Sequence, residues 1–103
     1  MNEFESACMQ IISSVGDARS YYIEAIHLAC EGKYDDAEQS IENGNKSMLE
    51  GHQAHAELLS RDAKGELKNS GMLLIHAEDQ LMSAEDFKIL AREFIETYKL
   101  IKK

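Results

Sequence analysis

His76, Asp79 and Gln80 are the residues of this chain whose types and spacing best suit chemistry. They lie in the stretch 71–82, whose sequence is GMLLIHAEDQLM. The other positions are mostly apolar, and their pattern favours a helix. In a helix of 3.6 residues per turn, side chains three and four positions after His76 lie on the same face as its ring. An imidazole, a carboxylate and an amide therefore share one otherwise apolar surface.

The imidazole of His76 suits reversible phosphoryl transfer. Its neutral ring is a nucleophile near physiological pH, and the phosphorylated ring stays reactive. Such a transfer depends mainly on positioning and on groups that offset the charge of the phosphoryl oxygens. Taken alone, a histidine on an apolar face is more often a structural residue, so the surrounding pattern has to decide between the two interpretations.

The first element that the apolar spacing predicts is a helix over residues 3–31. Gly16 lies inside it, where glycine indicates a bend or the close approach of another helix. Gly32 is expected to end it in a left-handed conformation. The apolar positions recur every three or four residues, as an amphipathic helix requires: Phe4, Ala7, Cys8, Ile11, Val15, Ala18, Tyr22, Ala25, Ile26 and Ala29.

A second helix is predicted to start at Asp35, which can cap it together with Glu38, and to end near residues 60–63. Its middle contains Asn43, Gly44 and Asn45, which lower intrinsic helix stability, so tertiary packing must hold it. Its apolar line is thin and comprises Tyr34, Ala37, Ile41, Met48, Leu49, Ala56 and Leu59.

Residues 61–70 are polar and predict a solvated loop, after which Asn69 or Ser70 can cap a third helix over about residues 70–100. The whole chain, residues 1–103, then forms a single all-α domain. We expect an antiparallel up-down-up three-helix bundle, because two short connections link three long helices.

The third helix is apolar over more of its circumference than a three-helix bundle needs. At about 100° per residue from His76, one group of apolar residues falls within about 100° on one side: Phe94, Phe87, Tyr98, Leu73, Ala91, Ala84, Ala77 and Ile95. A second group falls within about 60° on the other side: Leu90, Met72, Asp79, Ile101 and Ser83. This surplus face predicts contact with another subunit.

The composition excludes several classes of function. The formal charge is −8, which disfavours nucleic acid and anionic membranes as partners and favours a partner with a basic face. No apolar run reaches the roughly 20 residues that span a bilayer, and no secretory signal is evident, so we expect a cytoplasmic protein. Cys8 and Cys30 are too far apart along one helix to bridge and are expected to be buried thiols.

The chain resembles the lactose/cellobiose (N,N′-diacetylchitobiose) class of enzyme IIA proteins of the bacterial phosphoenolpyruvate-dependent sugar phosphotransferase system. The most specific part of the resemblance is the run LLIHAEDQLM at residues 73–82. Weaker matches support it elsewhere in the chain: Gly16-Asp17-Ala18-Arg19-Ser20, Glu31-Gly32-Lys33-Tyr34, Ala37-Glu38 and Ala54-His55.

The resemblance implies a homotrimeric phosphocarrier. His76 would take a phosphoryl group on Nε2 from phospho-HPr and pass it to a cysteine of enzyme IIB, during uptake of a β-linked disaccharide such as cellobiose, lactose or chitobiose. The membrane would be involved only indirectly, through the IIC transporter. Asp79 would meet its two symmetry copies around one divalent ion per trimer, expected to be Mg²⁺. Three buried carboxylates need such a cation, and oxygen ligands suit it.

This sequence departs from the family pattern at two positions. The family commonly has Gln and His where this chain has Glu78 and Gln80. Gln80 can still donate a hydrogen bond from the face of His76 and is a candidate partner of that ring. Of the other histidines, His55 is a candidate to line the phosphorylation hollow of a neighbouring subunit, whereas His52 is interpreted as structural or exposed.

Two alternatives stay open at the level of sequence. The hinge Gly32-Lys33-Tyr34-Asp35-Asp36-Ala37 also resembles a tetratricopeptide-type hairpin, which would suit a non-catalytic helical adaptor. Such arrays need about three repeats, however, and the third helix lacks the required self-similarity. A regulatory IIA protein that no longer transfers phosphoryl groups is the second alternative.

Overall fold

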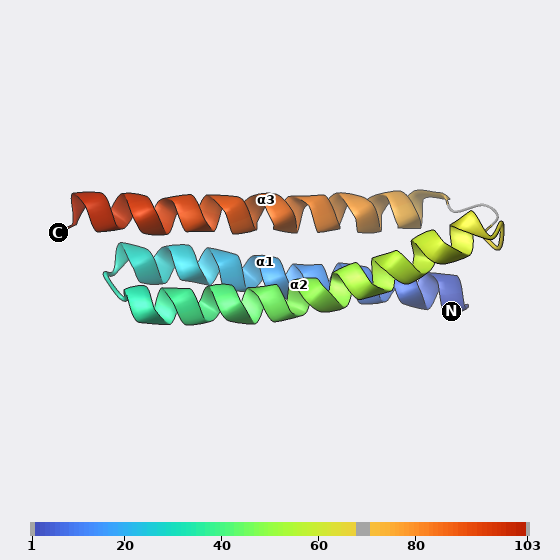
Figure 1. Ribbon diagram of the computed structural model, residues 1–103, viewed down its shortest axis with the longest axis horizontal. Coiled ribbons are helices and arrows are strands. Elements are labelled where there is room, and N and C mark those ends of the chain that lie inside the picture. Colours follow the sequence, from blue (N-terminus) through green and yellow to red (C-terminus); the bar gives the residue numbers. More distant parts are fainter. Residues whose placement is uncertain (1, 68–70, 103) are drawn as a thin grey trace.

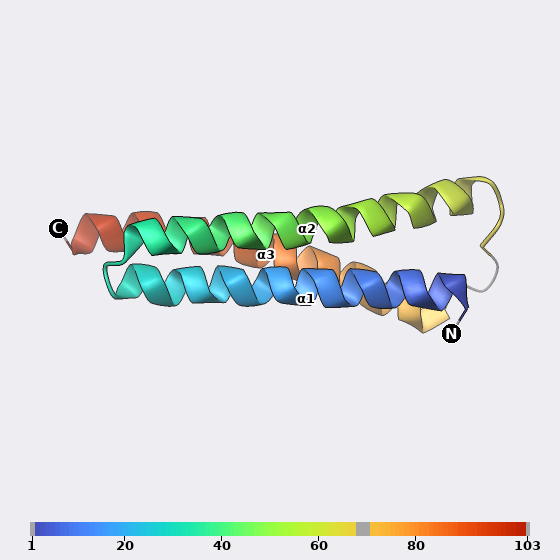
Figure 2. The ribbon, with the colours of Figure 1, turned by 90° about the horizontal axis from the view of Figure 1, so that it is seen from below.

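Three long helices form the described part of the chain, residues 2–67 and 71–102, in this computed structural model. They are α1 (Glu3–Cys30), α2 (Tyr34–Ala63) and α3 (Gly71–Ile101). They run up, down and up along a bundle of 55 × 18 × 16 Å, with α1 and α3 parallel (Figures 1 and 2). The all-α antiparallel prediction is thus confirmed. No helix in these residues combines the length and the apolar character needed to cross a membrane.

The helix ends follow local chemistry, with one correction. Gly32 has φ of +79° and ends α1 as expected. Asn2 caps α1, since its side chain accepts from the Glu5 amide at 2.8 Å. The prediction that Asp35 caps α2 was wrong, because Lys33 is the capping residue and Asp35 lies in the first turn. There its charge still favours the positive end of the helix dipole. The predicted caps Asn69 and Ser70 lie outside the described residues.

The core is built mainly from α1, whose buried positions match the predicted period. Its members from α1 and α3 are Cys8, Ile11, Val15, Ala18, Tyr22, Ala25, Ala29, Ala77, Leu81, Ala84, Ala91 and Ile95. The predicted line on α2 was partly wrong, because Leu58 is buried while Leu49 and Leu59 are exposed. On α2 the buried stripe includes Gly44 and Gly51, which a search for large apolar residues overlooks.

Gly44 and Tyr22 hold the middle of α2 against α1. The Tyr22 ring is fully buried, and its hydroxyl donates to Asn45 Oδ1 at 2.8 Å. A Cβ at Gly44 would lie 2.5 Å from Tyr22 Cε1. The weak Asn43-Gly44-Asn45 segment is therefore held by tertiary packing, as expected. The close approach expected at Gly16 does not occur there, since a Cβ at Gly16 would meet nothing within 4 Å.

Alanine at Gly44 and at Gly16 is expected to change stability in opposite directions. Gly44→Ala should lower the free energy of unfolding by about 1–3 kcal/mol, because the buried Tyr22 ring has no space to retreat. Gly16→Ala should raise it by about 0.5–1 kcal/mol, since alanine favours helix and meets no neighbour. Urea unfolding of both variants measures the difference. Equal effects of the two substitutions would contradict the Tyr22 packing.

The burial of Tyr22 also predicts a loss of stability in alkali. Burial raises the pKa of its hydroxyl from 10.0 to about 12, with a smaller contribution from the Glu85 charge. Between these pH values the unfolded chain loses the proton first, so stability falls as pH rises, by up to about 2–3 kcal/mol. Urea midpoints near pH 9 and pH 11 should therefore differ less in Tyr22→Phe than in the unmodified chain. The same pH dependence in both proteins would rule out this origin.

The two cysteines have different environments. Both are free, as expected, and Cys8 is buried. The expectation that Cys30 is buried was wrong, because it is the last residue of α1 and its side chain is exposed. At the end of α1 the other helices no longer cover every apolar position, so Cys30 remains accessible to solvent.

Candidate functional site

His76 lies on the first part of α3, at the end of the bundle where α1 begins and α2 ends (Figure 1). Its side chain is exposed. Met72 and Ile75 on the same turns are 85% and 66% exposed. The imidazole therefore stands in an accessible apolar surface, where a partner protein could cover it and exclude water.

Asp79 and Gln80 follow His76 on this surface, as predicted. Asp79 is exposed and Gln80 is half-buried. Within residues 2–67 and 71–102, none of the three side chains is in a hydrogen bond or ion pair with another side chain. In the unmodified chain, the Gln80 amide makes no hydrogen bond to the His76 ring among these residues, and its candidate role as a partner of that ring stays a prediction. All three polar groups are thus available to groups outside this chain.

A single copy of the chain does not supply enough ligands for a metal at Asp79. Among the described residues, no group of three or more His, Cys, Asp or Glu side chains could hold an ion. Asp79 nevertheless has the hard oxygen atoms that Mg²⁺ prefers, and it lies on an exposed face. The residue fits a metal site only if other copies of the chain contribute their Asp79.

Glu78 and His55 form a hydrogen-bonded contact that the sequence did not reveal. Glu78 Oε2 lies 2.8 Å from His55 Nε2, and the His55 side chain is only 18% exposed. Together they line a hollow of about 160 Å³ between α2 and α3, with Leu58, Leu59, Asp62, Leu67 and Leu74. Two turns further along α3, Glu85 contacts the exposed His52 in the same way, in agreement with the interpretation of His52 as structural or exposed.

The pair was missed because it depends on how α2 and α3 are aligned. Glu78 lies about 200° around the helix from His76, so the two side chains face different sides of α3. No local spacing relates Glu78 to His55, which lies 23 residues earlier. The only feature of the sequence that could have suggested this contact is that α2 contains histidines and α3 contains glutamates.

Cys8, a buried thiol near this end of the bundle, is a poor candidate for the nucleophile. Burial raises the pKa of its thiol, and the charges of Glu78 and Glu5 raise it further. The thiolate is the reactive form of cysteine, and here it is disfavoured. His76 is therefore the better candidate for an accessible nucleophile.

Arg19, from the motif at residues 16–20, joins α1 to the His76 side of α3. Its Nη1 atom donates to Ser83 Oγ at 3.1 Å. Ser83 lies two helical turns after His76, on nearly the same face. This contact helps to hold α3 in register against α1.

The chain is a small all-α protein, a three-helix bundle whose exposed histidine on an apolar face is chemically suited to carry a group between protein partners. The comparisons with known proteins specify the family. The chain belongs to the family described as the lactose/cellobiose-specific IIA subunit of the PTS system, which matches residues 6–99. It is therefore a component of the phosphotransferase system, whose IIA proteins carry phosphoryl groups.

Relatives of this family match the chain over nearly its full length. A lactose-specific EIIA component from Staphylococcus epidermidis is 36% identical, over 95% of this chain and 94% of the relative. A lichenan-specific phosphotransferase IIA component from Bacillus subtilis is 34% identical, over 96% and 90%. The crystal structure of a cellobiose-specific enzyme IIA from Bacillus anthracis has a TM-score of 0.94 and 37% identity, covering 99% of this chain and 94% of that one.

Proposed function

We propose that this protein is a phosphohistidine carrier that takes a phosphoryl group from phospho-HPr on His76 and passes it to a cysteine of enzyme IIB. It works in the cytoplasm during uptake of a β-linked disaccharide such as cellobiose, lactose or chitobiose. The sugar contacts the membrane transporter IIC and never this chain. The observation that carries the proposal is the exposed position of His76 in an apolar surface, in a chain of the IIA family.

The chemistry consists of two balanced displacements. In the first, the Nε2 lone pair of neutral His76 forms a bond to phosphorus while the bond from phosphorus to the donor breaks. In the second, a cysteine thiolate of enzyme IIB attacks the phosphorus, and the electron pair of the P–N bond returns to His76. The docked partners exclude water, which protects the phosphohistidine from hydrolysis. Met72 and Ile75 supply apolar surface for this docking.

The proposed working state is a homotrimer. In it the exposed face of α3 that contains Asp79 contacts the other two copies. Three Asp79 carboxylates would then hold one divalent ion, for which Mg²⁺ is the proposed identity. When bound, this ion supplies positive charge that offsets the repulsion among the carboxylates. Gln80 is proposed to donate a hydrogen bond to a phosphoryl oxygen on His76, because its amide lies about 40° around the helix from that ring.

The proposal is tested by incubating the chain with phosphoenolpyruvate, enzyme I and HPr and measuring its intact mass. We expect one acid-labile phosphoryl group per chain, which is lost again when a cognate IIB protein is added. A chain that gains no phosphoryl group would exclude the carrier function and favour the regulatory alternative. Leaving out HPr is the control, and it should prevent the modification.

A further inference from the structure

Gly16 lies in the middle of α1 without a structural reason inside this chain. Its backbone is helical and its φ is not positive, so other residues could adopt the same conformation. A Cβ at this position would meet nothing within 4 Å, so no helix of the same chain needs the space. Glycine inside a helix nevertheless lowers stability relative to alanine. The missing side chain therefore indicates that something outside the chain approaches the backbone here.

Gly16 belongs to an exposed apolar strip of α1, which we call the α1 face: Met9, Ile12, Gly16 and Ile23. These four positions fall within about 60° of one another around the helix. Met9 and Ile23 are 41% and 36% exposed, and Ile12 is half-buried. Exposed apolar side chains that gather on one face are typical of interaction surfaces. The absent side chain of Gly16 leaves a notch in the middle of this surface.

The α1 face lies beside His76. The helices α1 and α3 run parallel, and Arg19 of α1 contacts Ser83 of α3 (Figures 1 and 2). Counting two turns back from this contact leads to Ile12 on α1 and to His76 on α3, so these two residues lie at about the same level. Gly16 follows one turn after Ile12, between the levels of His76 and Ser83. A partner that covers the His76 ring therefore also reaches the notch at Gly16.

The charges around the α1 face favour a partner with basic side chains. A hollow of about 390 Å³ borders this face and is lined by Asp17, Ser20, Tyr21 and Glu24. Within residues 2–67 and 71–102, neither Asp17 nor Glu24 takes part in an ion pair. Arg19 lies on the α3 side of the face and donates to the Ser83 hydroxyl instead of to a carboxylate. Two unpaired carboxylates thus stand next to a single arginine, in a chain of formal charge −8.

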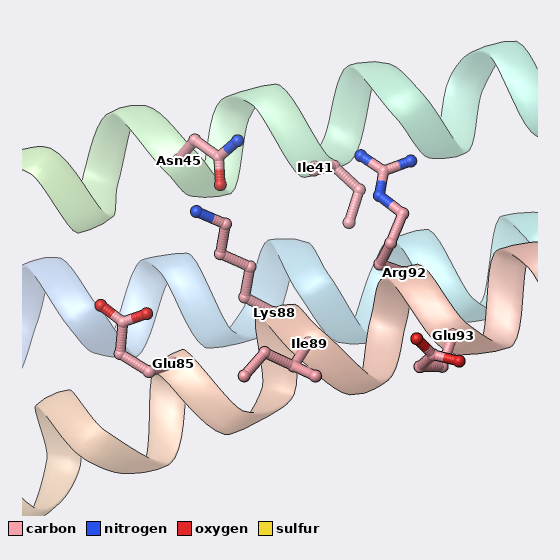
Figure 3. Close-up of a pocket in the computed structure, with 7 residues that line it drawn as sticks. All are labelled: Ile41, Asn45, Glu85, Lys88, Ile89, Arg92 and Glu93. Carbon is pink, nitrogen blue, oxygen red and sulfur yellow. The ribbon is translucent and has the colours of Figure 1, made fainter.

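The groove between α2 and α3 differs, because its charges are mixed and partly paired within the chain (Figure 3). It has a volume of about 340 Å³ and is lined by Ile41, Asn45, Glu85, Lys88, Ile89, Arg92 and Glu93. Arg92 donates to Glu38 of α2 at 2.6 Å, and Glu85 contacts His52. This groove therefore selects neither a basic nor an acidic partner, whereas the carboxylates beside the α1 face favour a basic one.

We propose that phospho-HPr docks on the α1 face while it covers His76, and that it contacts the α1 backbone in the notch at Gly16. The docking patch of HPr is apolar in its centre and bordered by lysine or arginine side chains, which pair with Asp17 and Glu24. An apolar centre with a polar rim is the usual composition of a protein interface. This inference rests on the proposed function and adds α1 to a docking surface that otherwise consists of α3 residues.

The test measures the rate of His76 phosphorylation against the concentration of phospho-HPr for the unmodified chain, Gly16→Ala and Gly16→Leu. Each added side chain fills part of the notch and holds the partner away from the backbone. We expect KM for phospho-HPr to rise about twofold with alanine and about tenfold or more with leucine. The kcat should change by less than about twofold, because neither side chain reaches the His76 ring.

Stability measurements separate a docking effect from a folding effect. Alanine and leucine both favour helix more than glycine does, and the space beside Gly16 is open. Both variants should therefore unfold at the same urea concentration as the unmodified chain or at a higher one. A raised KM in a chain of equal or greater stability cannot result from unfolding.

Gln53→Leu is the matched control, because it adds the same leucine at an exposed position of α2. Its KM for phospho-HPr should equal that of the unmodified chain. A Gly16→Leu chain with an unchanged KM would overturn the docking on α1 and leave the carrier function intact. An unmodified chain that gains no phosphoryl group would overturn both.

The charge of the partner is tested with the double variant Asp17→Asn and Glu24→Gln. Attraction between exposed opposite charges is screened by salt. The double variant should therefore have a higher KM at low salt, and its KM should depend less on salt than that of the unmodified chain. The same salt dependence in both proteins would overturn the pairing of these carboxylates with basic side chains of HPr.

Discussion

Replacing His76 with alanine is expected to abolish phosphorylation of the chain by phosphoenolpyruvate, enzyme I and HPr. The reason is chemical, because alanine has no lone pair that could bond to phosphorus. The fold should be unaffected, since the His76 side chain is exposed and lacks a side-chain partner in the described residues. Intact mass spectrometry after the reaction should find no added phosphoryl group, while circular dichroism should match the unmodified protein.

His27→Ala is the matched control for this experiment. His27 is also an exposed helical histidine, but it lies in the last turn of α1. This variant should gain one phosphoryl group per chain, as the unmodified protein does. A His76→Ala chain that still gained an acid-labile phosphoryl group would move the acceptor to another residue, with His27, His52 and His55 as the remaining histidines.

Removal of divalent metal is expected to dissociate the trimer of the unmodified protein but not that of Asp79→Leu. In magnesium buffer, light scattering should give about three times the chain mass of 11.6 kDa. A chelator should shift the unmodified protein toward single chains, because three facing carboxylates then repel one another without a cation. Leucine at this position would extend the apolar line of Ile75 and Met82, so the variant should remain trimeric.

Asp17→Leu serves as the control, because Asp17 is an exposed carboxylate on α1 and not on the α3 face that contains Asp79. Its trimer should respond to the chelator as the unmodified trimer does. A trimer of the unmodified protein that survives complete metal removal would eliminate the metal role of Asp79. If the Asp79→Leu variant were monomeric, Asp79 would not lie on the three-fold axis of the trimer.

The sequence predicted the helices well because their signals are local. The apolar period of α1 and the glycine after it placed the first helix within a residue of Glu3–Cys30. The predictions failed where the burial of a side chain depends on how another helix packs against it. The burial of Leu58 rather than Leu59 depends on how α2 is rotated against α1, and the glycines at 44 and 51 lie against α1 in this same rotation.

Some features of the candidate site could likewise be predicted from the sequence, and others could not. The shared face of His76, Asp79 and Gln80 follows from the helical period, so the sequence alone was sufficient to propose the chemistry. The sequence also determined the family, through the run at residues 73–82. Only the tertiary structure showed that Glu78 faces His55 and that α2 and α3 leave a groove beside Ile89, because both depend on the register between helices far apart in the chain. Helical period specifies which side chains share a face, whereas packing decides what each face meets.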